Sequence, residues 1–133
     1  MQYIGITRIN EKDEEIAECL QTLGMRRMSA RSLAGIRSLG TAKTREIEKI
    51  AGLHQPEVSV GVKDLIERGW VSESVEYKRG KGRPCKVYKL KVRFHAILAE
   101  LQLAIRKEEM KVVILLNTLR AQAKQTPVGM TNH

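Results

Sequence analysis

The chain has 133 residues, of which 42% are hydrophobic and only five are aromatic, which suits one domain with an aliphatic core and an appendage. Its net charge of +9 favours an anionic partner such as nucleic acid or a membrane surface. No apolar run approaches the roughly 18 residues that span a bilayer, and the acidic stretch 11–18 is unlike a targeting peptide. Two cysteines fit a reducing compartment. We therefore expect a soluble, cytoplasmic protein without a membrane partner.

The positive charge is concentrated in one segment. Residues 78–93 carry a charge of +8 and contain no Asp or Glu, which leaves only +1 of the total for the rest of the chain. The eight cations are Lys78, Arg79, Lys81, Arg83, Lys86, Lys89, Lys91 and Arg93. Such a patch, in contrast to a general excess of basic residues, indicates a surface that binds a polyanion.

The N-terminal region, 1–24, is expected to consist of an arm and a helix. Residues 1–9 alternate only partially between apolar and polar, which fits either a short strand or a loose arm. Asn10 is a favourable N-cap and acidic residues fill the first turns, so we predict a helix over Glu11–Leu23. Its apolar stripe would be Ile16, Cys19 or Leu20, and Leu23.

Two shorter helices are predicted next, each followed by a glycine that ends it. Ser29 would cap a helix that runs to about Leu39, and Thr44 would cap another that ends at Ala51. The inward side chains would be Leu33, Ile36 and Leu39 in the first helix and Ile47, Ile50 and Ala51 in the second.

The segment LHQPEVSVGVKDLIER predicts a further helix, over residues 55–68. His54 occupies the position of its cap, Pro56 suits a first helical turn, and Gly69 follows the last turn. Its apolar stripe would be Val58, Val62, Leu65 and Ile66. About three residues separate it from the preceding short helix, and two helices joined by such a tight turn form a helix-turn-helix, whose second member is the recognition helix.

The opposite face of this helix suits base readout in a major groove. The candidates are Gln55, Pro56, Ser59, Val60 and Lys63. Gln can pair with adenine, Lys with guanine, Ser with several base edges, and Pro or Val can touch a thymine methyl group. Glu57 either accepts a hydrogen bond from cytosine or simply favours the helix N-terminus. For this segment alone, an ordinary amphipathic helix with a solvated face is the alternative.

After Gly69 the apolar period changes from 3.6 toward 2, which predicts a β-hairpin around the turn 79–84. Trp70 is expected to be a core residue, and Pro84 to lie at a strand edge. The hairpin cations, together with the free N–H groups where the helix at Thr44 begins, suit contacts to a phosphate backbone. The candidates are Thr44, Arg45, Lys78, Arg79, Lys81, Arg83 and Lys86.

The order helix, helix, recognition helix and basic hairpin is that of a winged helix-turn-helix. The sequences TAKTREIEKIAGLHQPEVSVGVKDLIERGWV and GRPCKVYKL resemble the winged-helix transcription regulators of bacteria and archaea, the group that contains the ArsR, MarR and TrmB families. They look most like archaeal regulators of the ArsR/TrmB kind. The resemblance covers residues 29–91 and implies a winged helix that binds DNA, with its readers at the exposed positions of the recognition helix.

Residues 93–124 contain no Gly or Pro and predict one long helix. Apolar residues recur alternately three and four apart, as in the seam of a coiled coil or bundle, and Glu108 is the one polar member. The apolar seam residues are Phe94, Leu98, Leu101, Ile105, Val112, Leu115 and Leu119. A helix of this length, about 48 Å at 1.5 Å per residue, cannot bury its whole stripe on one small domain, so we expect it to pair two protomers.

These patterns predict a mainly α (α+β) fold: a winged helix-turn-helix with a two-stranded wing and a long C-terminal dimerisation helix. The divisions would be an N-terminal arm and helix (1–24), a DNA-binding domain (25–91), the dimerisation helix (92–124) and a flexible tail (125–133). The predicted function is that of a homodimeric, sequence-specific regulator that binds double-stranded DNA. The alternatives are an architectural, sequence-tolerant DNA-binding protein and a protein-interaction module of the transcription machinery.

Other chemistry finds little support in the sequence. There is no nucleophile motif, phosphate-binding loop or cluster of metal ligands, so we expect neither an enzyme nor a bound metal or cofactor. Cys85 lies beside cations that favour a thiolate, which raises the alternative of a redox switch. Nothing identifies a small-molecule effector.

Overall fold

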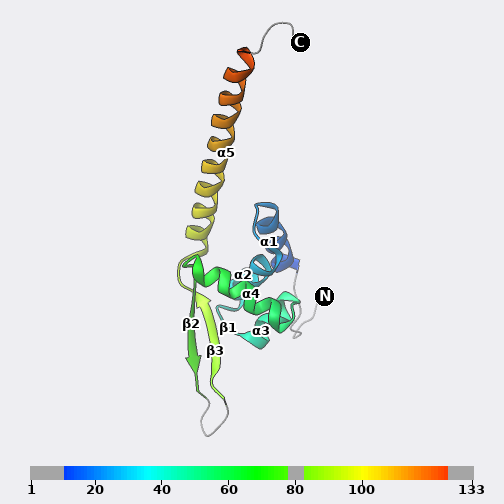
Figure 1. The fold of residues 1–133 in the computed structure, drawn as a ribbon. Coiled ribbons are helices and arrows are strands. Elements are labelled where there is room, and N and C mark those ends of the chain that lie inside the picture. The colour runs from blue at the N-terminus through cyan, green and yellow to red at the C-terminus, as the bar shows by residue number, and fades with distance from the viewer. Residues whose placement is uncertain (1–10, 78–82, 126–133) are drawn as a thin grey trace. The chain divides into compact units, whose positions relative to one another are not determined.

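The computed structural model describes residues 11–77 and 83–125. The chain forms two units, one that ends at Ile97 and one that begins at Leu98. The elements, labelled in Figure 1, are α1 (Glu11–Thr22), α2 (Arg27–Leu39), β1 (Thr41–Lys43), α3 (Thr44–Ala51), α4 (Gln55–Glu67), β2 (Val71–Glu76), β3 (Cys85–Leu90) and α5 (Phe94–Lys124). The predicted fold class is confirmed: the described residues are mostly helical, with a small antiparallel sheet and a long C-terminal helix.

Helix α2 is central to the first unit, and α1, α3 and α4 all pack against it. It begins earlier than predicted, with Arg26 in the N-cap position. Ser29 is therefore not a cap but an internal residue, only 1% exposed. Its hydroxyl donates a hydrogen bond to Asp64 of α4. Leu33 and Ile36 are buried as predicted, whereas Leu39 at the last turn is exposed. Gly40 ends the helix with a positive φ of 83°.

The contact between α2 and α4 depends on a glycine. A Cβ atom placed on Gly61 would lie 2.5 Å from the backbone oxygen of Met28 and 2.6 Å from Oγ of Ser32. Both distances are well inside van der Waals contact, so only a residue without a side chain lets the two helices approach this closely. The flanking Val58 and Val62 of α4 are buried at the same interface.

The sheet has three antiparallel strands in the order β1-β3-β2, rather than the two predicted. β2 and β3 form the predicted hairpin, with Ser74 opposite Val87. β1 adds the third strand by pairing Ala42 with Tyr88. Three residues are too few to show a period, so this strand could not be predicted from the apolar pattern.

The predicted cap at Thr44 is replaced by the residue before it, whereas the predicted cap at His54 is confirmed. Thr44 is the first residue of α3 and Lys43 occupies the N-cap position. The Lys43 N–H donates to the Glu46 carboxylate at 2.8 Å, which satisfies one of the free N–H groups of the helix start. At α4, His54 is the N-cap residue as predicted.

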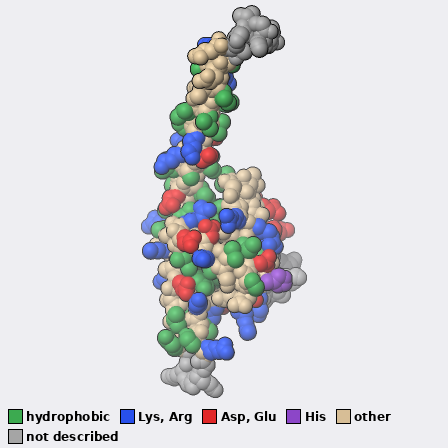
Figure 2. All heavy atoms as spheres, in the orientation of Figure 1, with side chains coloured by type: hydrophobic (Ala, Val, Ile, Leu, Met, Phe, Trp, Pro, Cys, Tyr) green, Lys and Arg blue, Asp and Glu red, His purple; other side chains and the backbone are tan. Residues whose placement is uncertain are grey.

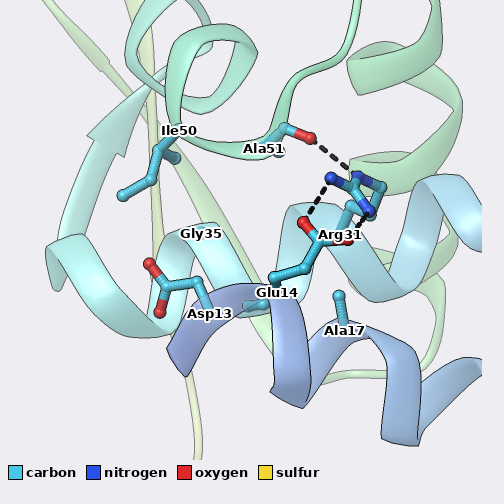
Figure 3. Close-up of a pocket in the computed structure, with 8 residues that line it drawn as sticks. Asp13, Glu14, Ala17, Arg31, Gly35, Ile50 and Ala51 are labelled. Carbon is cyan, nitrogen blue, oxygen red and sulfur yellow. Dashed lines mark hydrogen bonds and ion pairs between the residues drawn. The ribbon is translucent and has the colours of Figure 1, made fainter. Parts of the chain in front are cut away.

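Arg31 of α2 joins three helices, as Figure 3 shows. Its Nη1 and Nη2 atoms donate to the two carboxylate oxygens of Glu14 in α1 at 3.0 and 2.8 Å. Its Nε donates to the carbonyl oxygen of Ala51, the last residue of α3, at 2.8 Å. A fork of donors in one plane suits arginine, and lysine could not make all three bonds with this geometry. In α1 itself Leu20 is buried and its alternative Cys19 is exposed, so Leu20 is the residue of the predicted stripe. Leu23, also predicted for the stripe, is exposed just after the helix ends at Thr22.

The bonds between Arg31 and Glu14 make the free energy of unfolding depend on pH. The hydrogen bonds from Arg31 lower the pKa of Glu14 below its ordinary value of 4.5, so the stabilisation is complete above that value and is lost as the pH falls through the lowered pKa. We expect Glu14→Gln to remove this part of the acid dependence, under roughly 1 kcal/mol because the pair is partly exposed to solvent. Urea unfolding across the acid range measures it. Glu15→Gln, at the next and exposed position, should keep the wild-type dependence; equal pH profiles for wild type and Glu14→Gln would contradict the assignment.

The second unit consists of the α5 residues from Leu98 onward. The segment Val112–Leu116 is helical, and all five of its side chains are exposed in the single chain. Of the predicted seam, Leu98, Val112, Leu115 and Leu119 are exposed, Ile105 is half-buried and Leu101 is buried. Phe94 belongs to the first unit, where Arg37 lies over its ring at 5.2 Å. Among the described residues, no helix is long and apolar enough to cross a membrane.

Candidate nucleic-acid interface

The turn between α3 and α4 orients the predicted recognition helix. Gly52 ends α3 in the left-handed conformation with φ of 66°, where a side chain would be strained. His54 is extended at φ −90°, and its N–H donates to Oε1 of Glu57 at 2.9 Å. The helix that begins at Gln55 ends one residue before the predicted Arg68, and Gly69 follows with φ of 81°. Two helices joined by three residues are thus present where the sequence predicts a helix-turn-helix.

The predicted reading face of α4 is exposed. The core side of the helix contains Val58, Gly61, Val62 and Leu65, all buried. The five candidates for base readout are all exposed on the other side, and they are Gln55, Pro56, Ser59, Val60 and Lys63. Val60, with 48% of its surface exposed, is a large apolar side chain without a core to join. Burial has therefore divided the helix as its periodicity predicted, except that Ile66 of the predicted stripe is only half-buried.

Two acidic residues of α4 are directed to α2 and not left on this face. Oε2 of Glu57 lies 3.3 Å from Nη1 of Arg27. Asp64 accepts a hydrogen bond from the Ser29 hydroxyl at 2.6 Å and also pairs with Arg68 at 3.2 Å. The bond from the His54 N–H lowers the pKa of Glu57, and the charge of Arg27 adds to the effect. Glu57 is thus engaged in capping and pairing, which supports the second of its two predicted roles.

Among the described cations of the hairpin, Lys86 has an acidic partner and Arg83 has none. Lys78, Arg79 and Lys81 lie outside the described residues. Lys86 is exposed, but its Nζ atom lies 3.6 Å from the Glu73 carboxylate of β2. Arg83 is exposed and makes no ion pair with any described residue. On the face that Figure 2 shows, Lys and Arg side chains are likewise intermixed with Asp and Glu side chains.

At the start of α3 the two candidates differ in exposure. Arg45 is exposed, whereas Thr44 is only half-exposed and hydrogen-bonds through its side chain to Tyr88 of β3. Burial raises the pKa of Tyr88 and the nearby Glu73 adds to it, while the Thr44 bond opposes the shift.

Trp70 is buried at 2% exposure, as predicted for a core residue, with the Arg68 guanidinium 4.8 Å from its ring centre.

Within the part of the chain that the structure describes, no group of three His, Cys, Asp or Glu residues could hold a metal ion. Cys19 and Cys85 are both free thiols.

Comparison with known proteins identifies the fold. No protein-family model matches this chain, and no curated protein matches it. Among solved structures it is similar to a possible transcriptional regulator from Methanosarcina mazei Go1, with 18% identity over 79% of this chain and 86% of that one and a TM-score of 0.59. It is also similar to a MarR family transcriptional regulator from Silicibacter pomeroyi, with 16% identity over 90% and 84% of the two chains and a TM-score of 0.51. Likeness at these identities confirms the winged-helix fold, and the finer likeness to the ArsR/TrmB kind stays a prediction.

Proposed function

We propose that this chain is a sequence-specific transcriptional regulator that binds double-stranded DNA as a homodimer. One observation carries the proposal: α4 follows a helix-turn-helix turn and exposes the five candidate readers, whose only charge is that of Lys63. Its acids at positions 57 and 64 are paired with residues of α2, and the third, Glu67, is exposed in the last turn. A face of this composition suits the major groove, where a free carboxylate would meet the phosphates unfavourably. The similar solved structures named as transcriptional regulators support the same reading.

Contacts would divide between base readout and backbone. Gln55, Pro56, Ser59, Val60 and Lys63 would read base edges, with Lys63 suited to guanine and Val60 to a thymine methyl group. The residues proposed for the phosphates are Arg45, Arg83 and Lys86, with Lys78, Arg79 and Lys81 of the hairpin tip and a lesser part for Thr44.

Dimerisation would use α5. Leu98, Val112, Leu115 and Leu119 follow the seam spacing and are exposed in a single chain, so a second copy would bury them. A two-fold dimer with one recognition helix per protomer requires half-sites separated by about 34–36 Å or a multiple of it.

The test is a selection of bound fragments from random genomic duplexes at several salt concentrations. Enrichment of a two-fold motif, with affinity that falls steeply as salt rises, is the expected result. Salt-sensitive binding without a motif would replace the proposal with an architectural protein, because such proteins separate specific from random DNA only weakly. No binding at low salt would leave the protein-interaction module.

Substitution of Lys63 tests the reading face directly. We expect Lys63→Ala to weaken binding to the selected motif about tenfold and to relax the preference at one base pair of each half-site, because a lost base contact costs roughly 1–3 kcal/mol. Lys49→Ala, at an exposed cation of α3 outside the reading face, is the control and should lower affinity less and without a change in preference. A uniform loss on all sequences would make Lys63 a phosphate contact instead.

A further inference from the structure

Helix α4 holds three acidic residues, and two of them, Glu57 and Asp64, are each bonded by a residue from the first turn of α2. Glu57 meets Arg27 at 3.3 Å, and Asp64 accepts from Ser29 at 2.6 Å. The third, Glu67, lies in the last turn. Glu57 and Asp64 are seven residues apart, which is two helical turns, so they lie on one flank of α4 beside the reading face.

The ion pair between Arg27 and Glu57 neutralises a charge on the surface of α4 more than it stabilises the fold. The Arg27 side chain is 52% exposed and that of Glu57 is 30% exposed, so the pair contributes little to folding. The cap on α4 depends on Oε1 of Glu57, which His54 already bonds, whereas Arg27 contacts Oε2. Arg27 can therefore be removed without loss of the cap, which would leave a carboxylate at the start of the helix without its counter-charge.

We propose that Arg27 is a positioning residue for DNA binding: it neutralises Glu57 and keeps that carboxylate directed away from the DNA phosphates. This inference rests on the proposed function. Arg27 then acts through Glu57 and makes no contact of its own with DNA. The same pairing explains how a recognition helix with an acid in its first turn can approach a polyanion.

The roles of Arg27 and Glu57 can be separated by a double-mutant cycle, measured as affinity for the DNA that wild type selects. Arg27→Ala should weaken binding about tenfold, because an unpaired carboxylate then faces the phosphates. Glu57→Gln keeps an oxygen for the His54 N–H and should change affinity by less than twofold. In the double variant, Glu57→Gln should restore affinity to within about twofold of wild type.

Arg26→Ala is the matched control, since it removes an equal charge from the adjacent exposed position, for which the described residues give no acidic partner. Glu57→Gln should not rescue Arg26→Ala. If the double variant at 27 and 57 binds as weakly as Arg27→Ala alone, with a salt slope lower by about one, Arg27 contacts phosphate itself and the proposal is overturned. Wild-type affinity in Arg27→Ala would overturn it too. Absence of DNA binding by wild type refutes the proposed function instead and is seen before any variant is made.

Discussion

Gly61→Ala should destabilise the fold by roughly 2 kcal/mol, although alanine favours helices. The new Cβ would lie 2.5 Å from the Met28 carbonyl oxygen, which belongs to the backbone of α2 and cannot turn away. The helices would have to separate, and the buried Val58 and Val62 beside the contact would lose packing. Thermal or urea unfolding followed by circular dichroism measures the change.

Ser59→Ala is the control for Gly61→Ala, because it makes a similar change two residues away on the exposed side of the same helix. It should leave stability unchanged or raise it by a few tenths of a kcal/mol. If Gly61→Ala is as stable as wild type, α2 and α4 are not in the close contact described here.

Leu115→Glu should convert the proposed dimer to monomers, with a dissociation constant raised at least about 100-fold. Leu115 is 62% exposed in the single chain, so the substitution does not disturb the fold of the first unit. In the proposed dimer it would place a carboxylate in an apolar seam, which costs several kcal/mol. Sedimentation equilibrium measures the association. Affinity for a two-fold DNA site should fall by 10²–10⁴ as the link between half-sites is lost.

Asn117→Glu is the matched control for Leu115→Glu, because it adds the same charge off the seam, where Arg120 already contacts Asn117 at 3.2 Å. It should remain dimeric. A monomeric wild type, or a Leu115→Glu variant that stays dimeric, would contradict pairing through this seam.

Much of the first unit could be predicted because its signals are local. The stripe of Val58, Val62 and Leu65 and the glycine after it predicted α4 and its exposed face, and the change of period after Gly69 predicted the hairpin. The predicted start of α2 was wrong. Ser29 is a residue type that favours the cap position, but in this fold it lies in the interior, where it bonds Asp64, 35 positions along the chain. Propensity cannot anticipate a tertiary partner.

The electrostatics of the interface depended still more on distant contacts. From the sequence, Lys86 is one of eight cations in a segment, 78–93, that contains no Asp or Glu, yet the sheet brings Glu73 beside it. Likewise Arg27 had no predicted role until α2 placed it beside Glu57, 30 residues away. Charge runs can be read from a sequence, whereas charge pairs across elements require the fold.

The glycine contact at position 61 also limits how the protein can be regulated. Since the backbone of α4 at Gly61 contacts the Met28 backbone and the Ser32 side chain of α2 without room for a methyl group, α4 cannot roll or slide on α2 without a steric cost. In the proposed regulator, a signal that changes DNA binding would then move α2 and α4 together as one rigid body. In the proposed dimer, such a movement would change the distance or the angle between the two recognition helices. A ligand would then regulate DNA binding by stabilising one arrangement of the protomers.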